Sequence, residues 1–154
     1  MKLPRTLLFP VLVISSVFCV SQATTAPDVI FDEYGDLRWE DEKARLDNFT
    51  IPLLNDTDTV GYILVSNETN GCSDEAAARG LRAKRYVVER RGVPWNHVVW
   101  RQEGYAPEIR TKLLVLPRGF TPSYPSLDST TAKRSGPPSR ACAVRLKKIK
   151  NSRW

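Results

Sequence analysis

The sequence predicts an α+β domain, a two-layer sandwich with two helices on one face of a four-stranded mixed sheet. The predicted order is strand, helix, strand, helix, strand, strand. Two observations support this class: four short apolar runs have the length of strands, and two longer segments between them repeat apolar residues at helical spacing. Apolar residues make up 42% of the 154 residues, which is enough for a packed core.

The first strand and helix are predicted from an apolar run, a turn and a helical stripe. Val29–Phe31 is a short apolar strand, and the turn at Tyr34–Asp36 ends it. A stripe of apolar residues then recurs at spacings of 7, 3 and 4, which is one face of a helix: Trp39, Leu46, Phe49 and Leu53. Pro52 should end or kink this helix near Ile51, because proline has no backbone N–H to donate.

The second strand and helix give the clearest pattern in the chain. Gly61–Val65 is an apolar run typical of a strand buried on both faces. A loop rich in turn residues follows, and Ser73 is a good N-cap for a helix over about Asp74–Arg91. Gly92 is a natural stop for that helix. Small residues on one side of the helix would let it approach the sheet closely: Ala76, Ala77, Gly80 and Ala83.

Two further strands complete the predicted sheet. Val98–Trp100 opens the third strand, and Lys112–Leu116 is the fourth, which Pro117 ends. The turn at Gly104–Pro107 lies between them. Both strand–helix–strand units require right-handed crossovers, which place the two helices on one face.

The N-terminal segment has the layout of a secretory signal peptide. Met1–Arg5 carries two positive charges, Thr6–Val20 carries none and is almost wholly apolar, and Ser21–Ala23 has small residues where a signal peptidase reads. We therefore expect residues 1–23 to be removed after Ala23, and the protein to be exported to a periplasm or to the extracellular space. An uncleaved anchor helix is the alternative, although the uncharged run of about 15 residues is shorter than the roughly 20 that span a bilayer.

Charge divides the remaining chain into an acidic domain and a basic tail. Residues 24–117 hold 12 basic and 16 acidic residues, whereas residues 118–154 hold 9 basic residues and only Asp128. The second part is rich in Pro and Ser, which predicts a mobile tail. Its basic cluster Val144–Lys150 suits an anionic surface, or it simply keeps the protein soluble. Export makes a nucleic-acid partner unexpected.

Cysteine and histidine usage limits the chemistry. An exported chain meets an oxidising compartment, so Cys72 and Cys142 can pair, although their spacing does not decide whether they do. With one His and three Cys, and no glycine-rich phosphate loop, we expect no metal, no cofactor and no enzymatic activity. A small hydrolase using His97 is the remote alternative, and it would need a nucleophile and an acid beside that residue.

Local motifs in the predicted domain follow a known order. The second strand holds Ile63–Val65, the following helix holds Arg82-Ala83, an aromatic–aliphatic pair precedes Gly92-Val93, and the third strand ends at Glu103–Pro107. Over residues 29–117 this order of motifs resembles the outer-membrane protein A-like C-terminal domain, the periplasmic module that binds peptidoglycan. The resemblance implies the same α+β fold and a role in binding peptidoglycan or another component of the cell envelope.

The resemblance also suggests a ligand site. Stem peptides of peptidoglycan carry ammonium and carboxylate groups, so a site for them needs an acid and a base close together. Glu68 is the carboxylate nearest to the family's Gly-His-Thr-Asp position, and Arg79 and Arg82 both compete for the role of the ligand arginine.

Three other interpretations of these residues stay open. The charged residues are simply exposed on a helix face, or the protein is an interaction module that kept the fold and lost the ligand. An aromatic ligand surface made of Trp39, Trp95 and Trp100 is the third interpretation.

Overall fold

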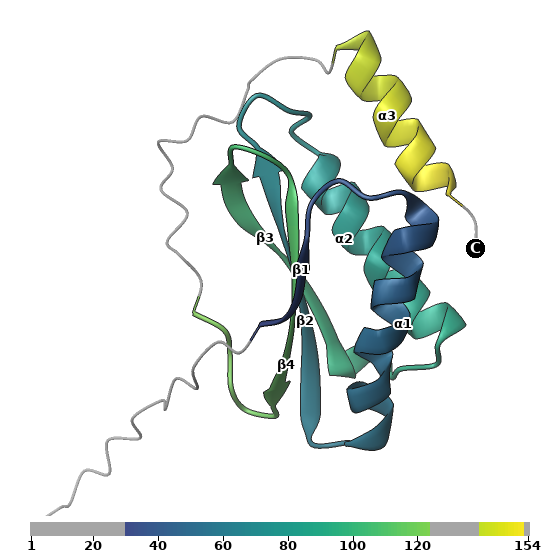
Figure 1. Ribbon diagram of the computed structural model, residues 1–154, viewed down its shortest axis with the longest axis vertical. Helices are drawn as coiled ribbons and strands as arrows, with labels where there is room; N and C mark the ends of the chain where they lie inside the picture. The colour runs from purple at the N-terminus through teal and green to yellow at the C-terminus, as the bar shows by residue number, and fades with distance from the viewer. Residues whose placement is uncertain (1–29, 124–138, 153–154) are drawn as a thin grey trace, which may run out of the picture.

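The computed structural model describes residues 30–123 and 139–152 and confirms the predicted fold class. Its elements follow in the order β1 (Ile30–Tyr34), α1 (Trp39–Asn55), β2 (Thr59–Glu68), α2 (Glu75–Arg85), β3 (Val98–Ala106), β4 (Arg110–Pro117) and α3 (Arg140–Asn151) (Figure 1). A π-helical turn at Tyr86–Arg90 extends α2, and a 3-10 turn at Trp95–His97 precedes β3. Within the described residues, no helix is long and apolar enough to cross a membrane.

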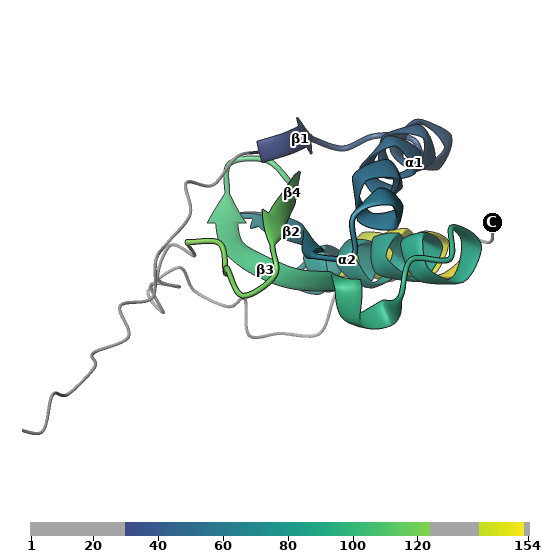
Figure 2. The same cartoon turned by 90° about the horizontal axis from the view of Figure 1, so that it is seen from below.

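The four strands form one mixed sheet in the order β1-β4-β2-β3. β2 pairs in parallel with β3, where Ile63 lies opposite Trp100, and antiparallel with β4, where Ile63 lies opposite Leu113. β1 pairs antiparallel with β4 and forms the edge of the sheet opposite β3. α1 and α2 both lie on the same side of this sheet (Figure 2).

The main core lies between the sheet and these two helices. Ile63 and Val65 of β2 point into it together with Leu46 and Phe49 of α1 and Val87 after α2, and all five side chains are fully buried. Alternate residues of β2 and β4 form a second apolar cluster: Val60, Tyr62, Leu64, Leu114 and Leu116. β2 is therefore buried on both faces, as its continuous apolar sequence predicts.

Two glycines let the helices approach the sheet closely. A Cβ added at Gly61 would lie 2.6 Å from side-chain atoms of Leu53 and Phe49 in α1. A Cβ added at Gly80 in α2 would lie 2.5 Å from the Trp100 ring in β3. Packing against Trp100 therefore requires a residue without a side chain at this position of α2.

The structure corrects the expectation that α1 ends at Pro52 near Ile51. The helix continues to Asn55, with Pro52 inside its last turn. A proline this close to the end removes one intrahelical hydrogen bond, and the Pro52 carbonyl still accepts from the Asp56 N–H at 3.0 Å.

The structure also corrects the expectation of a mobile tail, because residues 140–151 form helix α3. Ser139 caps it by accepting from the Cys142 N–H at 3.3 Å. Leu146 and Ile149 lie one turn apart and are buried against Ala78 of α2. Residues 124–138, which belong to the same predicted tail, lie outside the described residues.

A disulfide joins α3 to the loop before α2. Cys72 and Cys142 are bonded, with their Cα atoms 5.5 Å apart. The pairing that the sequence left open is therefore present. The bond closes a loop of 70 residues, and closing a loop of this size contributes about 4 kcal/mol in the chain-entropy treatment.

Gly80→Ala should destabilise the protein by about 1–3 kcal/mol, because the new methyl group would overlap the Trp100 ring. At an exposed helical site the same change stabilises by about 1 kcal/mol. Urea unfolding measures the difference, and Trp100→Leu in the same background should recover part of the loss. A stabilised Gly80→Ala variant would contradict the close packing of α2 on β3.

The disulfide can be tested in a Cys19→Ser background, which leaves only Cys72 and Cys142. Iodoacetamide should add no mass to the denatured, unreduced protein and two labels after reduction. Replacing both cysteines with serine should lower the free energy of unfolding by about 2–4 kcal/mol. Two labels without reductant would show that the thiols are free.

Candidate functional site

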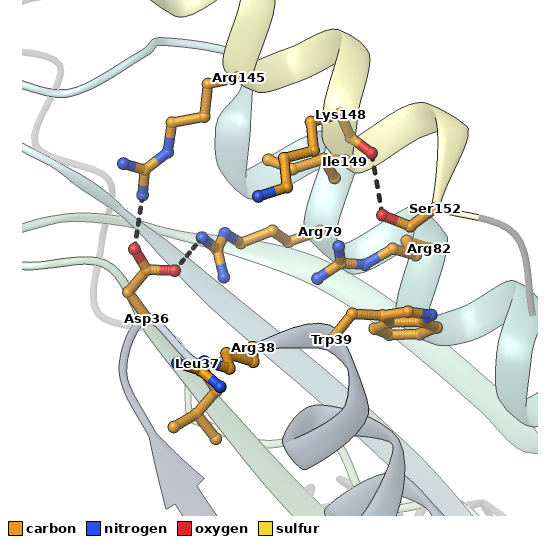
Figure 3. A pocket seen from close by; sticks show the side chains of 10 residues that line it. All are labelled: Asp36, Leu37, Arg38, Trp39, Arg79, Arg82, Arg145, Lys148, Ile149 and Ser152. Atoms are coloured by element: carbon orange, nitrogen blue, oxygen red, sulfur yellow. Dashed lines mark hydrogen bonds and ion pairs between the residues drawn. The ribbon is translucent and has the colours of Figure 1, made fainter.

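A pocket of about 240 Å³ lies where the β1–α1 loop, α2 and α3 meet (Figure 3). Five basic side chains and one acidic side chain are among the residues that line it: Arg38, Arg79, Arg82, Arg145, Lys148 and Asp36. Trp39 and Ile149 contribute apolar surface. Positive charge therefore dominates the lining.

Two acidic side chains hold two arginines at one end of the pocket. Glu75 Oε1 accepts hydrogen bonds from Arg79 Nε at 2.9 Å and from Arg145 Nε at 2.8 Å. Asp36 pairs through Oδ1 with Arg79 Nη2 and through Oδ2 with Arg145 Nη2, the latter at 2.9 Å. These contacts tie the β1–α1 loop, α2 and α3 together.

The arginines also set the acidity of Asp36. Partial burial alone would raise the pKa of its carboxyl group, but hydrogen bonds and charge from Arg79 and then Arg145 hold that pKa below its ordinary value. A folded-state pKa below the unfolded one means that these contacts stabilise the protein at neutral pH. That stabilisation is lost as the pH falls through the folded-state pKa.

A second ion pair lies deeper in the fold. Glu42 of α1 is 1% exposed and pairs through Oε2 with Arg82 Nη2, while its Oε1 accepts from the Tyr34 hydroxyl at 3.4 Å. Burial raises the pKa of Glu42 and lowers that of Arg82, and the attraction between the two charges opposes both shifts. Removing these two charged groups from water therefore costs the folded state free energy.

Arg82 keeps donors that the fold does not use. Its guanidinium lies over the Trp39 ring, with Cζ 4.2 Å from the centroid. Of its three side-chain nitrogens, only Nη2 has a hydrogen-bond partner among residues 30–123 and 139–152. Arg38 and Lys148 form no ion pair with any residue that the structure describes. The unpaired Nε of Arg82 is buried, so the donors that the pocket presents are Arg82 Nη1 and the side chains of Arg38 and Lys148, which favour an anionic ligand.

The predicted site residues are only partly brought together. Arg79 and Arg82 line one pocket, but both are buried, so assigning them to an exposed helix face is wrong. Glu68 is exposed, lies outside the lining and forms no ion pair with a described residue. Its neighbour Asn67 is fully buried and binds the start of α2, donating to the Ser73 carbonyl and accepting from the Ala76 N–H, each at 2.9 Å.

Sequence reasoning missed Asp36, Arg145 and Lys148. The sequence places Asp36 in a turn and predicts that the two cations lie in a mobile tail. A signal was available for the tail, since Leu146 and Ile149 stand at helical spacing beside a cysteine. Nothing in the sequence places the tail beside the β1–α1 loop.

The other candidate residues do not form a site. His97 is 8% exposed, and its ring Nε2 lies 2.6 Å from Arg118 Nη2; no nucleophile or acid among the described residues bonds to it. Trp39 and Trp100 pack against the main core, whereas Trp95 is 71% exposed beside Lys84. The described residues contain no group of His, Cys, Asp and Glu suited to a metal ion.

Comparison with known proteins adds no relative. No protein-family model matches the chain, and no curated protein and no solved structure matches it. The likeness to the outer-membrane protein A-like domain therefore stays a prediction.

The buried pair can be tested by a double-mutant cycle. Glu42→Gln should lower the free energy of unfolding by about 3 kcal/mol, because Arg82 is left charged and buried without its partner. Arg82→Gln should cost a similar amount, and the double variant clearly less than the sum. Urea unfolding followed by circular dichroism gives the three values. Strictly additive losses would contradict the pairing.

Proposed function

We propose that this protein is a non-enzymatic binding module of the cell envelope, which holds an anionic part of peptidoglycan stem peptides in the basic pocket. The observation that carries the proposal is the surplus of cationic donors at Arg82, Arg38 and Lys148. Carboxylates of a stem peptide are suited to arginine, whose planar fork makes parallel hydrogen bonds. The signal-peptide layout and the family resemblance support an envelope location.

Asp36 takes the role that we expected for Glu68. Its side chain is 53% exposed, and it lies at the pocket beside Arg79 and Arg145. An exposed carboxylate held in its ionised form can accept hydrogen bonds from the ammonium group of a ligand. Asp36 of the β1–α1 loop and Arg79 of α2 thus lie side by side. A zwitterionic stem peptide requires this combination of an acidic and a basic side chain.

A second function has its own support. Arg79 already pairs with Glu75 and Asp36, and Arg82 with Glu42. These pairs can be a structural replacement for a lost ligand, in which case the protein is an interaction module of the same fold. The exposed basic side chains of α3, such as Lys147, would then form a general basic surface for an anionic partner.

Retention on purified bacterial sacculi separates these functions. The oxidised protein should be retained, and Lys148→Gln should weaken binding about tenfold through loss of one charge-assisted contact. Lys147→Gln is the matched control, because it removes the same charge from the exposed side of the same helix. Glu68→Ala should leave retention unchanged, since Glu68 lies outside the pocket.

Two results would count against peptidoglycan binding in the pocket. Absence of retention favours the interaction module. Equal losses for Lys147→Gln and Lys148→Gln would show that α3 acts as a general basic surface and not as part of a defined site.

A further inference from the structure

We propose that the pocket takes a ligand with two anionic groups, one bound by α2 and one by α3, and that the disulfide keeps the α3 wall in place. This inference deepens the proposed function by defining the ligand class of the same pocket. It depends on charge placement and on the attachment of α3.

The two walls carry separate cationic donors. Figure 3 shows Arg79 and Arg82 extending from α2 on one side, and Arg145 and Lys148 from α3 on the other. On the α2 wall, Arg82 retains Nη1 without a partner among the described residues, whereas its unpaired Nε is itself buried. On the α3 wall, Lys148 has no ion-pair partner among those residues. Each wall therefore offers its own contact for an anion.

The acids at the site leave more than one positive charge uncompensated. Glu75 and Asp36 are shared between Arg79 and Arg145, and Glu42 is used by Arg82. Arg38 and Lys148 remain without an acidic partner in the part of the chain that the structure describes. A monoanion would neutralise one of these charges, whereas a ligand with two anionic groups neutralises both: one group beside Lys148 on the α3 wall, and the other in the part of the pocket that Arg38 of the β1–α1 loop lines together with Arg82 of the α2 wall.

The position of α3 depends on few contacts. Only Leu146 and Ile149 of the helix are buried, against Ala78, and Arg145 adds its ion pairs to Asp36 and Glu75. A helix of 12 residues is marginal on its own in water. The Cys72–Cys142 bond holds it at α2, so loss of the bond should remove the Lys148 wall and leave the Arg82 wall.

Calorimetric titration with glutarate and butyrate tests this design, because the two differ in the second carboxylate. The oxidised protein should bind glutarate about tenfold more tightly than butyrate. Lys148→Gln should abolish this preference, and Lys147→Gln should keep it. The Cys72→Ser/Cys142→Ser variant, shown to be folded by its circular dichroism, should also lose the preference while still binding butyrate.

Several results would overturn the inference: equal affinities for the two acids, no binding of either acid, or a preference that survives in Lys148→Gln or in the cysteine variant. Failure of the proposed function looks different. If sacculi are not retained but the glutarate preference and its loss in Lys148→Gln hold, the two-walled anion site stands and peptidoglycan is excluded as its ligand. If sacculi are retained without any glutarate preference, only the two-walled site fails.

Discussion

The Glu75 carboxylate links the two helices that form the basic pocket. It is 3% exposed and accepts from Arg79 within its own helix and from Arg145 of the C-terminal helix. A buried carboxylate is costly unless charge and hydrogen bonds satisfy it, and two guanidinium groups do so here. Asp36 then joins the same two arginines from the β1–α1 loop. Three segments far apart in the sequence therefore meet at one charged junction.

This junction explains why a basic pocket exists in an otherwise acidic domain. Its acids pair with Arg79 and Arg145, so Arg38 and Lys148 further along the pocket have no acidic partner among the described residues. α3 alone would be a solvated basic segment. Docking of the two helices places Arg82 and Lys148 in the lining of one pocket, which is the basis for the proposed anion site.

The sheet and its two covering helices could be predicted from local patterns, because apolar runs and helical stripes report burial directly. The glycine in α2 also signals close packing, which Trp100 explains. The site could be predicted only in part. Arg79 and Arg82 were found through a family resemblance, but their partners Asp36 and Glu42 come from other elements, and ion pairing across elements leaves no periodic trace. α3 was missed because its composition is that of a tail, and its position comes from the disulfide, two buried side chains and the ion pairs of Arg145.

Amide hydrogen exchange of α3 tests the charged junction most directly. The opening free energy of Arg140–Asn151 should be measured in the oxidised protein, in Glu75→Gln, in Arg145→Gln and in the double variant. If Glu75 and Arg145 are in direct contact, the amides of α3 should be protected in the oxidised protein. The effects of the two substitutions on the opening free energy should then be coupled by about 1 kcal/mol or more. Unprotected amides in the unaltered protein, or strictly additive effects of the two substitutions, would show that α3 is not held at Glu75.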